Sequence, residues 1–335
     1  MATKKYCLAA CLLYMGYIDL HDYLKKKRVM KNNAGYLLAG ILLLISFIAC
    51  KQKPTTLVPE ETVNSGTVKI AVDESLQPIV DEEAYVFKQL NTNANVGITY
   101  GTENRVLRLL LNDSVRFVIL SRELNAEEVK ILKDRTLPPV VDRFAVDAIT
   151  FIVNKASTDT LTSVNEIKKM LNGQTKTSTD IVFDNPNSSL IRYLKAFSGN
   201  TELKLKNIFA VKNNKEVIKY ISTHPQAIGI TGFNWLNDPD KDYADAVKNV
   251  KIVAVKDENS KEAPGQYFKP SQTTLALNQY PFARGLYIIN STGKMGLGSG
   301  FAQFLLSERG QRVILRSGIL PDSIPPREIS IKRKF

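Results

Sequence analysis

The chain has 335 residues, a formal charge of +12 and only three cysteines. That length allows one large domain or two modest domains with cores of their own. Three cysteines exclude a disulfide framework. The cationic excess is spread along the chain and lacks interleaved aromatic residues, which argues against a nucleic-acid groove. Because residues 1–49 hold seven Lys/Arg and two Asp/Glu, about +7 remains beyond them, a mild excess that suits an anionic ligand.

The first fifty residues contain a targeting signal. Residues 30–49 begin with Met-Lys and continue as an uncharged run rich in Leu, Ile and Ala, which ends at Cys50. A basic start and an apolar core shorter than the roughly 20 residues of a spanning helix are typical of a bacterial signal peptide. We therefore predict that residues 1–29 are a non-native N-terminal extension. Residues 50–65, rich in Lys, Thr, Pro and Glu, are predicted to form a tether.

From Gly66 onward, strand-like and helix-like segments alternate. We expect strands at 67–72, 96–100 and 115–120, and helices at 77–90, 103–111 and 125–134. Strand, helix, strand at this spacing predicts a parallel sheet with right-handed crossovers. It also predicts a ligand crevice at the carboxyl ends of the strands.

A second alternating unit follows a long β-prone run. Residues 138–154 are too many for one typical strand, and they suit a strand that passes from one lobe into another. Residues 251–255 are a candidate for the return crossing. Between these runs we expect helices at 164–171 and 215–222, a helix that begins at Asn187, and strands at 181–183, 209–211 and 227–230.

Polar residues follow two of the expected strands. Glu74 and Ser75 come after the first strand, and Ser121 and Arg122 come after the third. Each loop offers a hydroxyl, and a guanidinium suits a tetrahedral oxyanion. The alternative for Ser121 and Arg122 is a helix cap with a solvated arginine. Glu74 opposes an anion unless its carboxyl points away or stays protonated.

The stretch 184–192 has the pattern of a strand end, a turn and a helix start. Asn187 is a candidate N-cap, and Ser188, Ser189 and Arg192 gather at the positive end of the helix dipole, where anions bind. Ordinary capping is the alternative, because asparagine and serine cap many helices.

Several stretches, in this order along the chain, resemble the substrate-binding lipoproteins of phosphate ABC transporters. They are residues 47–50, 119–124, 147–154, 226–230, 280–287 and 298–311. The resemblance implies a two-lobed α/β fold of the type II periplasmic-binding-protein kind, in which each lobe is a mostly parallel sheet flanked by helices. Lobe I would comprise residues 66–146 and 252–335, and lobe II residues 147–251, with the ligand cleft between them.

The resemblance also implies a ligand, a site and a location. The ligand would be phosphate or a related oxyanion, delivered to an ABC permease in the inner membrane. The protein would be a monomer, lipid-anchored in the cell envelope and facing the periplasm, with the inner or outer membrane left open. We expect no cofactor, no metal and no catalytic residue. Cys50 would carry the lipid, Asp147 would accept a proton from phosphate, and the other contacts would come from Glu74, Ser75, Ser121, Arg122, Asn187, Ser188, Ser189 and Arg192.

Two departures from that family keep other functions open. The first loop lacks the family's Gly-Ser-Thr character, and residues 185–189 lack its glycine. The alternative is a cell-envelope sensor or interaction protein that keeps the fold and binds a different ligand or partner. An enzyme is disfavoured, because beyond Cys50 the chain has a single histidine, His224, and no His-Glu-x-x-His or Gly-x-Ser-x-Gly pattern.

Overall fold

The structure, a computed structural model, describes residues 61–175, 179–203, 205–261 and 263–323. The expected extension, signal peptide and lipidation site lie outside the described residues, as does most of the tether. Pro59–Phe335 form one compact unit, so the expected lobe boundaries stay predictions. None of the described helices is long and apolar enough to cross a membrane.

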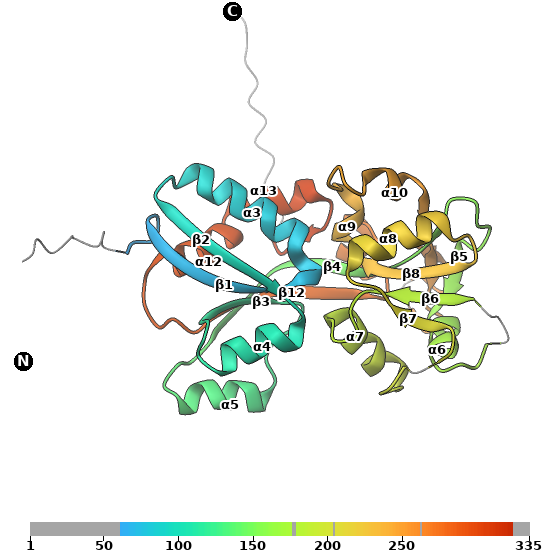
Figure 1. Ribbon diagram of the computed structural model, residues 1–335, viewed down its shortest axis with the longest axis horizontal. Helices are drawn as coiled ribbons and strands as arrows, with labels where there is room; N and C mark the ends of the chain where they lie inside the picture. The colour runs from blue at the N-terminus through green and yellow to red at the C-terminus, as the bar shows by residue number, and fades with distance from the viewer. Residues whose placement is uncertain (1–60, 176–178, 204, 262, 324–335) are drawn as a thin grey trace, which may run out of the picture. The chain divides into compact units, whose positions relative to one another are not determined.

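Strands and helices alternate along most of the described chain (Figure 1). The strands are β1 (Gly66–Asp73), β2 (Ala94–Gly101), β3 (Phe117–Leu120), β4 (Val140–Asn154), β5 (Leu161–Ser163), β6 (Asp180–Phe183), β7 (Ile208–Ala210), β8 (Ala227–Gly232), β9 (Val250–Ile252), β10 (Ala254–Lys256), β11 (Tyr267–Phe268), β12 (Ala283–Asn290) and β13 (Leu320–Pro321). The helices are the short 3-10 helix η1 (Glu74–Leu76), α3 (Gln77–Leu90), α4 (Glu103–Leu111), α5 (Ala126–Asp134), α6 (Val164–Leu171), α7 (Ser189–Ser198), α8 (Asn214–Thr223), α9 (Asn234–Asn237), α10 (Ala244–Lys248), α11 (Gln272–Ala276), α12 (Leu297–Leu306) and α13 (Glu308–Ser317).

Two groups of parallel strands are joined by antiparallel ones. The main sheet has the order β2-β1-β3-β12-β4-β8-β6-β7, and β9 and β13 also pair with β4. Within it, β1 is parallel to β2 and β3, and β6 is parallel to β7 and β8. Strands β12 and β4 are antiparallel to their neighbours. The prediction of an α/β fold is confirmed, but the two parallel groups belong to one mixed sheet, because β4 and β12 pair antiparallel between them.

Strand β4 connects the two groups, as its length predicted. Eight of its first nine residues, all but Phe144, pair with β12, and from Ile149 to Val153 it pairs with β8. The expected return crossing at 251–255 is wrong. There, β9 pairs with the end of β4, while β10 joins β5 and β11 in a separate small sheet. The hydrogen bonds of this segment therefore stay with the β8 side of the molecule.

Aromatic and aliphatic side chains fill the core on both sides of β4. Phe151 and Phe282 pack with ring centroids 5.2 Å apart, as do Phe87 and Phe301. Such burial of apolar surface supplies most of the folding free energy. The glycines before Phe301 serve close packing, because a Cβ on Gly300 would lie 1.8 Å from the carbonyl oxygen of Val63.

Candidate functional site

The loop after β1 turns sharply into α3. Asp73 is fully buried, and its Oδ1 accepts a hydrogen bond of 3.0 Å from the backbone N–H of Ser75. This side-chain cap starts η1 and holds the Ser75 side chain inside the protein. Glu74, between them, is half-buried. Burial raises the pKa of Glu74, and the neighbouring Asp73 raises it further.

Helix α7 begins one residue later than the sequence indicated. Asn185 accepts a hydrogen bond from the N–H of Asn187, and this turn leaves Asn187 exposed. The N-cap is Ser188, not Asn187, because its Oγ accepts from the N–H of Ile191. The Ser188 hydroxyl also donates to the buried Asp184 at 2.6 Å. The hydroxyl of Ser188 is therefore bonded within its own turn, whereas the hydroxyl of Ser189 contacts a distant part of the chain.

Ser189 lies against the loop after β1, although 114 residues separate it from Ser75. Their hydroxyl oxygens are 3.1 Å apart, and both are buried. The Nη1 of Arg284 donates to both hydroxyls, at 3.2 Å to Ser75 and 3.3 Å to Ser189. Three hydrogen-bonding groups from β12, η1 and α7 thus converge, and we name Ser75, Ser189 and Arg284 the central cluster.

Arg284 was not among the site residues expected from the sequence. It lies directly opposite Asp147 in the antiparallel pairing of β12 with β4. Its Nη2 and Nε donate to Asp147 Oδ2 at 2.7 and 3.2 Å, and both side chains are almost completely buried. A cationic residue within an otherwise apolar strand was the available signal, but its register against β4 could not be known.

Asp147 is held from a second direction by the segment after β8. The backbone N–H of Asn234 donates to Oδ1 at 3.0 Å, and its side-chain amide donates to Oδ2 at 2.8 Å. Gly232 gives this arrangement room, because a Cβ there would lie 2.9 Å from the Arg284 guanidinium. Asp147 thus orients the Arg284 guanidinium through two hydrogen bonds to one oxygen, Oδ2.

The single tryptophan of the chain connects the two sides of the cluster. Trp235 Nε1 donates to the carbonyl oxygen of Ser75 at 2.8 Å, and the Asn234 amide donates to the same oxygen at 3.2 Å. Trp235 is 3% exposed. The segment after β8 is therefore bound directly to the loop after β1.

Two further buried carboxyls face this region. Burial raises the pKa of Asp73, although the nearby Arg284 opposes the rise. Burial also raises the pKa of Asp184, to about 7, against the hydrogen bond from Ser188. The hydroxyl of Ser189 also lies close enough to the Asp73 carboxyl to oppose the rise. Ionised carboxyls at these positions would repel an oxyanion, whereas protonated ones would not, because unpaired buried charges of one sign repel.

Arg122 belongs to an ionic network. Its Nε donates to Glu103 at 2.8 Å, and its Nη1 and Nη2 donate to the two carboxylate oxygens of Glu128, both at 2.8 Å. Arg192 reaches Glu103 from α7 at 2.7 Å. Ser121 is buried, and its hydroxyl has no partner among the described residues.

The structure thus divides the expected site residues into groups. Ser75 and Ser189 meet in the central cluster, which Asp147 supports through Arg284. Glu74 is adjacent to it, and Arg122 and Arg192 meet at Glu103. Asn187 points to solvent, Cys50 lies outside the described residues, and the direct ligand contacts stay predictions. Among described residues, no group of His, Cys, Asp and Glu is arranged to hold a metal ion.

The fold and the site together define a class of protein. Two groups of strands, joined by β4, bring hydroxyl and guanidinium groups together between them, which is the architecture of a two-lobed binding protein. The chain belongs to the PBP superfamily, because residues 58–309 match the family described as the PBP superfamily domain. This match confirms the class that the sequence resemblance implied.

The comparisons with individual proteins agree with this family. The phosphate-binding protein PstS of Borreliella burgdorferi is 26% identical over 280 residues, covering 77% of this chain and 90% of that protein. Among solved structures, a candidate phosphate ABC transporter substrate-binding protein with bound phosphate from Clostridium perfringens has a TM-score of 0.64 at 17% identity, covering 77% of this chain and 100% of that one. An ABC-type phosphate transport receptor from Vibrio cholerae has a TM-score of 0.58 at 17% identity, covering 76% and 100%. Both structures confirm the fold.

Proposed function

We propose that this protein binds phosphate or a closely related oxyanion between its two lobes. The observation that carries the proposal is the central cluster, in which the buried hydroxyls of Ser75 and Ser189 both lie within hydrogen-bond distance of Arg284. Hydroxyls and a guanidinium are the donors that a tetrahedral oxyanion needs. The name of the Borreliella relative, a phosphate-binding protein, supports the same ligand.

Arg284 takes the role of the cationic ligand contact in this proposal. Its planar guanidinium is oriented by Asp147, so little freedom remains to be lost when an anion binds. The hydroxyl of Ser75, from the loop after β1, and that of Ser189, from α7, would donate to the anion. Arg284 Nη1, which now donates to both hydroxyls, would donate to the anion in their place. The direct contacts expected for Glu74, Ser121, Asn187, Ser188 and Arg192 stay part of the proposal as contributors around this centre. Arg122 would contribute indirectly, because Glu103 and Glu128 bind its guanidinium.

A carboxyl group must also accept or share the ligand's proton. The sequence resemblance assigned that role to Asp147, but its oxygens already accept from Arg284 and Asn234. Asp73 suits the role better, since it is buried beside Ser75 and the Ser189 hydroxyl lies close enough to its carboxyl to lower its pKa. The proton would then be shared from either side: an ionised Asp73 would accept it from a protonated phosphate, and a protonated Asp73, which burial favours, would donate it to the oxyanion.

Closure about β4 is the proposed binding motion. Asp147 stands just before Ile149, where β4 changes its pairing from β12 to β8. A hinge there would separate the loop after β1 from α7 and expose the central cluster. The bonds from Trp235 and Asn234 to the Ser75 carbonyl oxygen would break on opening and form again on closure.

The cellular setting extends the same proposal. The protein would be a lipid-anchored, periplasm-facing monomer, acylated at Cys50, that delivers its ligand to an ABC permease. The apolar run before Cys50 supports this setting, and the Clostridium and Vibrio structures are named as ABC transport proteins. Which membrane carries the anchor is left open by the proposal.

Isothermal titration of the full chain with phosphate tests this function. We expect heat of binding with phosphate and at least about tenfold weaker binding for Ser75→Ala and Ser189→Ala, equivalent to ~1.4 kcal/mol each. Ser114→Ala is the matched control, because Ser114 is exposed. Absence of heat with phosphate would refute the proposal.

The second candidate is a cell-envelope sensor or interaction protein with another ligand. The buried carboxyls of Asp73 and Asp184 favour it, because they make the cluster less attractive to a multiply charged anion. Full-length protein that is folded, gives no heat with phosphate or sulfate, and still closes in the presence of cell-envelope extract would support this alternative.

A further inference from the structure

A groove separate from the central cluster lies between α3, α13 and the segment after α9. Its larger hollow has a volume of about 410 Å³ and includes Glu82, Val86 and Val313 in its walls. A second hollow, of about 220 Å³, continues toward α8 and shares Glu82 and Asp238 with the first. Helices α3 and α13 lie side by side at this groove (Figure 1).

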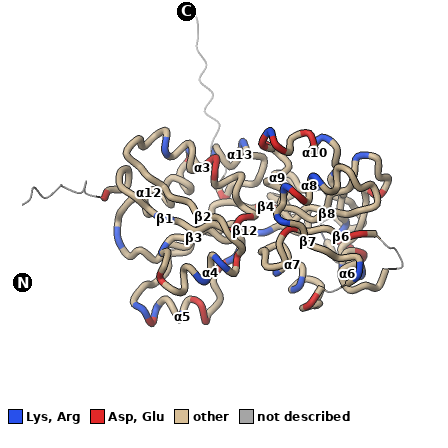
Figure 2. The backbone as a smooth tube through the Cα atoms, viewed as in Figure 1, with Lys and Arg blue, Asp and Glu red and all other residues tan. Residues whose placement is uncertain are grey.

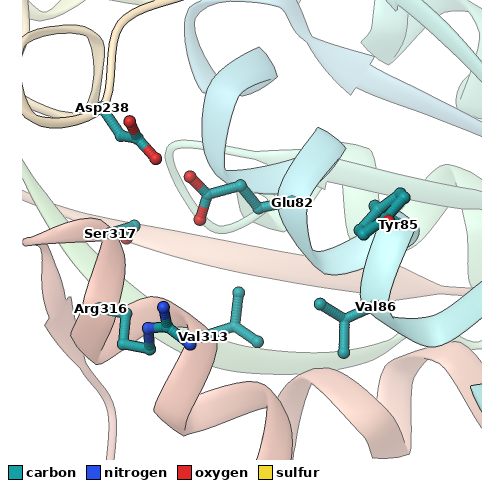
Figure 3. A pocket seen from close by; sticks show the side chains of 7 residues that line it. All are labelled: Glu82, Tyr85, Val86, Asp238, Val313, Arg316 and Ser317. Carbon is teal, nitrogen blue, oxygen red and sulfur yellow. The ribbon is translucent and has the colours of Figure 1, made fainter. Parts of the chain in front are cut away.

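Carboxylates predominate among the charged groups of the groove. Asp81, Glu82, Asp238 and Asp240 line it, against Lys215 and Arg316. Lys215 already pairs with Asp240, at 2.8 Å, and with Asp242. Figure 3 shows the carboxylates of Glu82 and Asp238 pointing toward each other from opposite walls. Like charges that face each other repel, so a cationic group between them would be attracted to both.

The other end of the groove is apolar. Tyr85 is 65% exposed, an unusual state for a large aromatic side chain. Figure 3 shows its ring beside Val86, with Val313 across the hollow. The groove therefore suits a segment that carries both basic and large apolar side chains.

The C-terminal residues 324–335 have that composition. They contain Arg327, Lys332, Arg333 and Lys334 against the single acidic Glu328, and they include three isoleucines and a terminal phenylalanine. Along the described backbone, basic and acidic residues are interspersed (Figure 2). The composition of residues 324–335 is thus complementary to that of the acidic groove.

The point where the described chain ends brings the tail within reach. The N–H of Ser323 donates to the side chain of Gln311 on α13, at 2.9 Å. On an α-helix, Gln311 and Arg316 are separated by only about 7.5 Å along the axis. Twelve residues span up to about 40 Å when extended. The tail can therefore reach the whole groove.

We propose that the C-terminal tail of this chain docks in the groove between α3, α13 and the segment after α9. Its lysine and arginine side chains lie between Glu82 and Asp238, and an apolar side chain covers Tyr85 and Val313. Because Glu82 belongs to α3 and Asp238 follows α9, the docked tail bridges elements from the β1 side and the β8 side of the molecule. This docking does not depend on the identity of the ligand in the central cluster.

Site-directed photo-cross-linking of the full chain tests the docking. A benzophenone amino acid replaces Tyr85, and mass spectrometry locates the linked residues. We expect intramolecular links to residues 324–335. We also expect their yield to fall at least about fivefold in Lys332→Glu/Arg333→Glu/Lys334→Glu, and similarly in Glu82→Gln/Asp238→Asn. Salt near 1 M should reduce the yield as well, because it shortens the screening length to roughly 3 Å.

A matched control removes charge elsewhere. Asp159→Asn/Glu127→Gln neutralises two exposed carboxylates outside the groove and should leave the yield unchanged. Links to another part of the chain, links between two molecules only, or a yield that the charge reversals do not alter would each overturn the proposal. Circular dichroism of every variant confirms that a lost link does not reflect unfolding.

Discussion

Replacing Arg284 by methionine should destabilise the protein strongly. The change leaves Asp147 as a completely buried carboxylate without its cation. Breaking a buried ion pair from one side costs about 3–5 kcal/mol. Asn234 still donates twice to Asp147, which compensates part of the lost interaction. We therefore expect a loss near the lower limit, about 3 kcal/mol in the free energy of unfolding.

Urea unfolding of the full chain, followed by fluorescence, measures this loss. Trp235 is the only tryptophan and is buried at the site, so its emission reports on this region. The double variant Asp147→Leu/Arg284→Met should recover most of the stability, since it removes both charges. Arg143→Met, which removes a half-exposed arginine paired with Asp322, should cost less than about 1 kcal/mol. A loss below about 1 kcal/mol for Arg284→Met, or no recovery in the double variant, would refute the reasoning.

Three further predictions concern other buried charges. Burial raises the folded-state pKa of Asp184 to about 7, so the folded state holds a proton that the unfolded state releases from roughly pH 4 upward. The free energy of unfolding should therefore fall as the pH rises from about 4 to about 7. Urea titrations of Asp184→Asn should show a free energy of unfolding that depends less on pH across this window. Glu83 is buried, and neither of its carboxyl oxygens is hydrogen-bonded to a described residue. Glu83→Met should therefore raise the free energy of unfolding by about 1–2 kcal/mol. Glu127 is exposed, so the control Glu127→Met should change that free energy by less than about 0.5 kcal/mol. The guanidinium of Arg122 is bonded to Glu103 and Glu128. Arg122→Ala should therefore lower the free energy of unfolding by about 2–3 kcal/mol and change phosphate affinity less than about threefold. A tenfold loss of affinity with unchanged stability would instead make Arg122 a ligand contact.

Local sequence patterns were sufficient for most elements and for part of the site. Alternating apolar runs predicted the parallel strands, and the length of residues 138–154 predicted the connecting strand β4. Ser75 lies just after β1, and Ser189 lies at the start of α7. Both positions follow from turn and cap chemistry, which depends on neighbouring residues. The start of α7 itself was missed by one residue, because Asn187 and Ser188 are both good capping residues and only the turn at Asn185 decides between them.

Contacts between distant segments decided the rest. Arg284 faces Asp147 only because β12 pairs with β4 in one particular register, and a shift of one residue would turn the guanidinium to the other face. Arg122 is held by Glu103 and Glu128 because α4 and α5 place their first turns beside it. By itself, the sequence determined which elements form and which polar residues follow them. The tertiary structure alone decided which charges meet, because pairing depends on register and packing over more than a hundred residues.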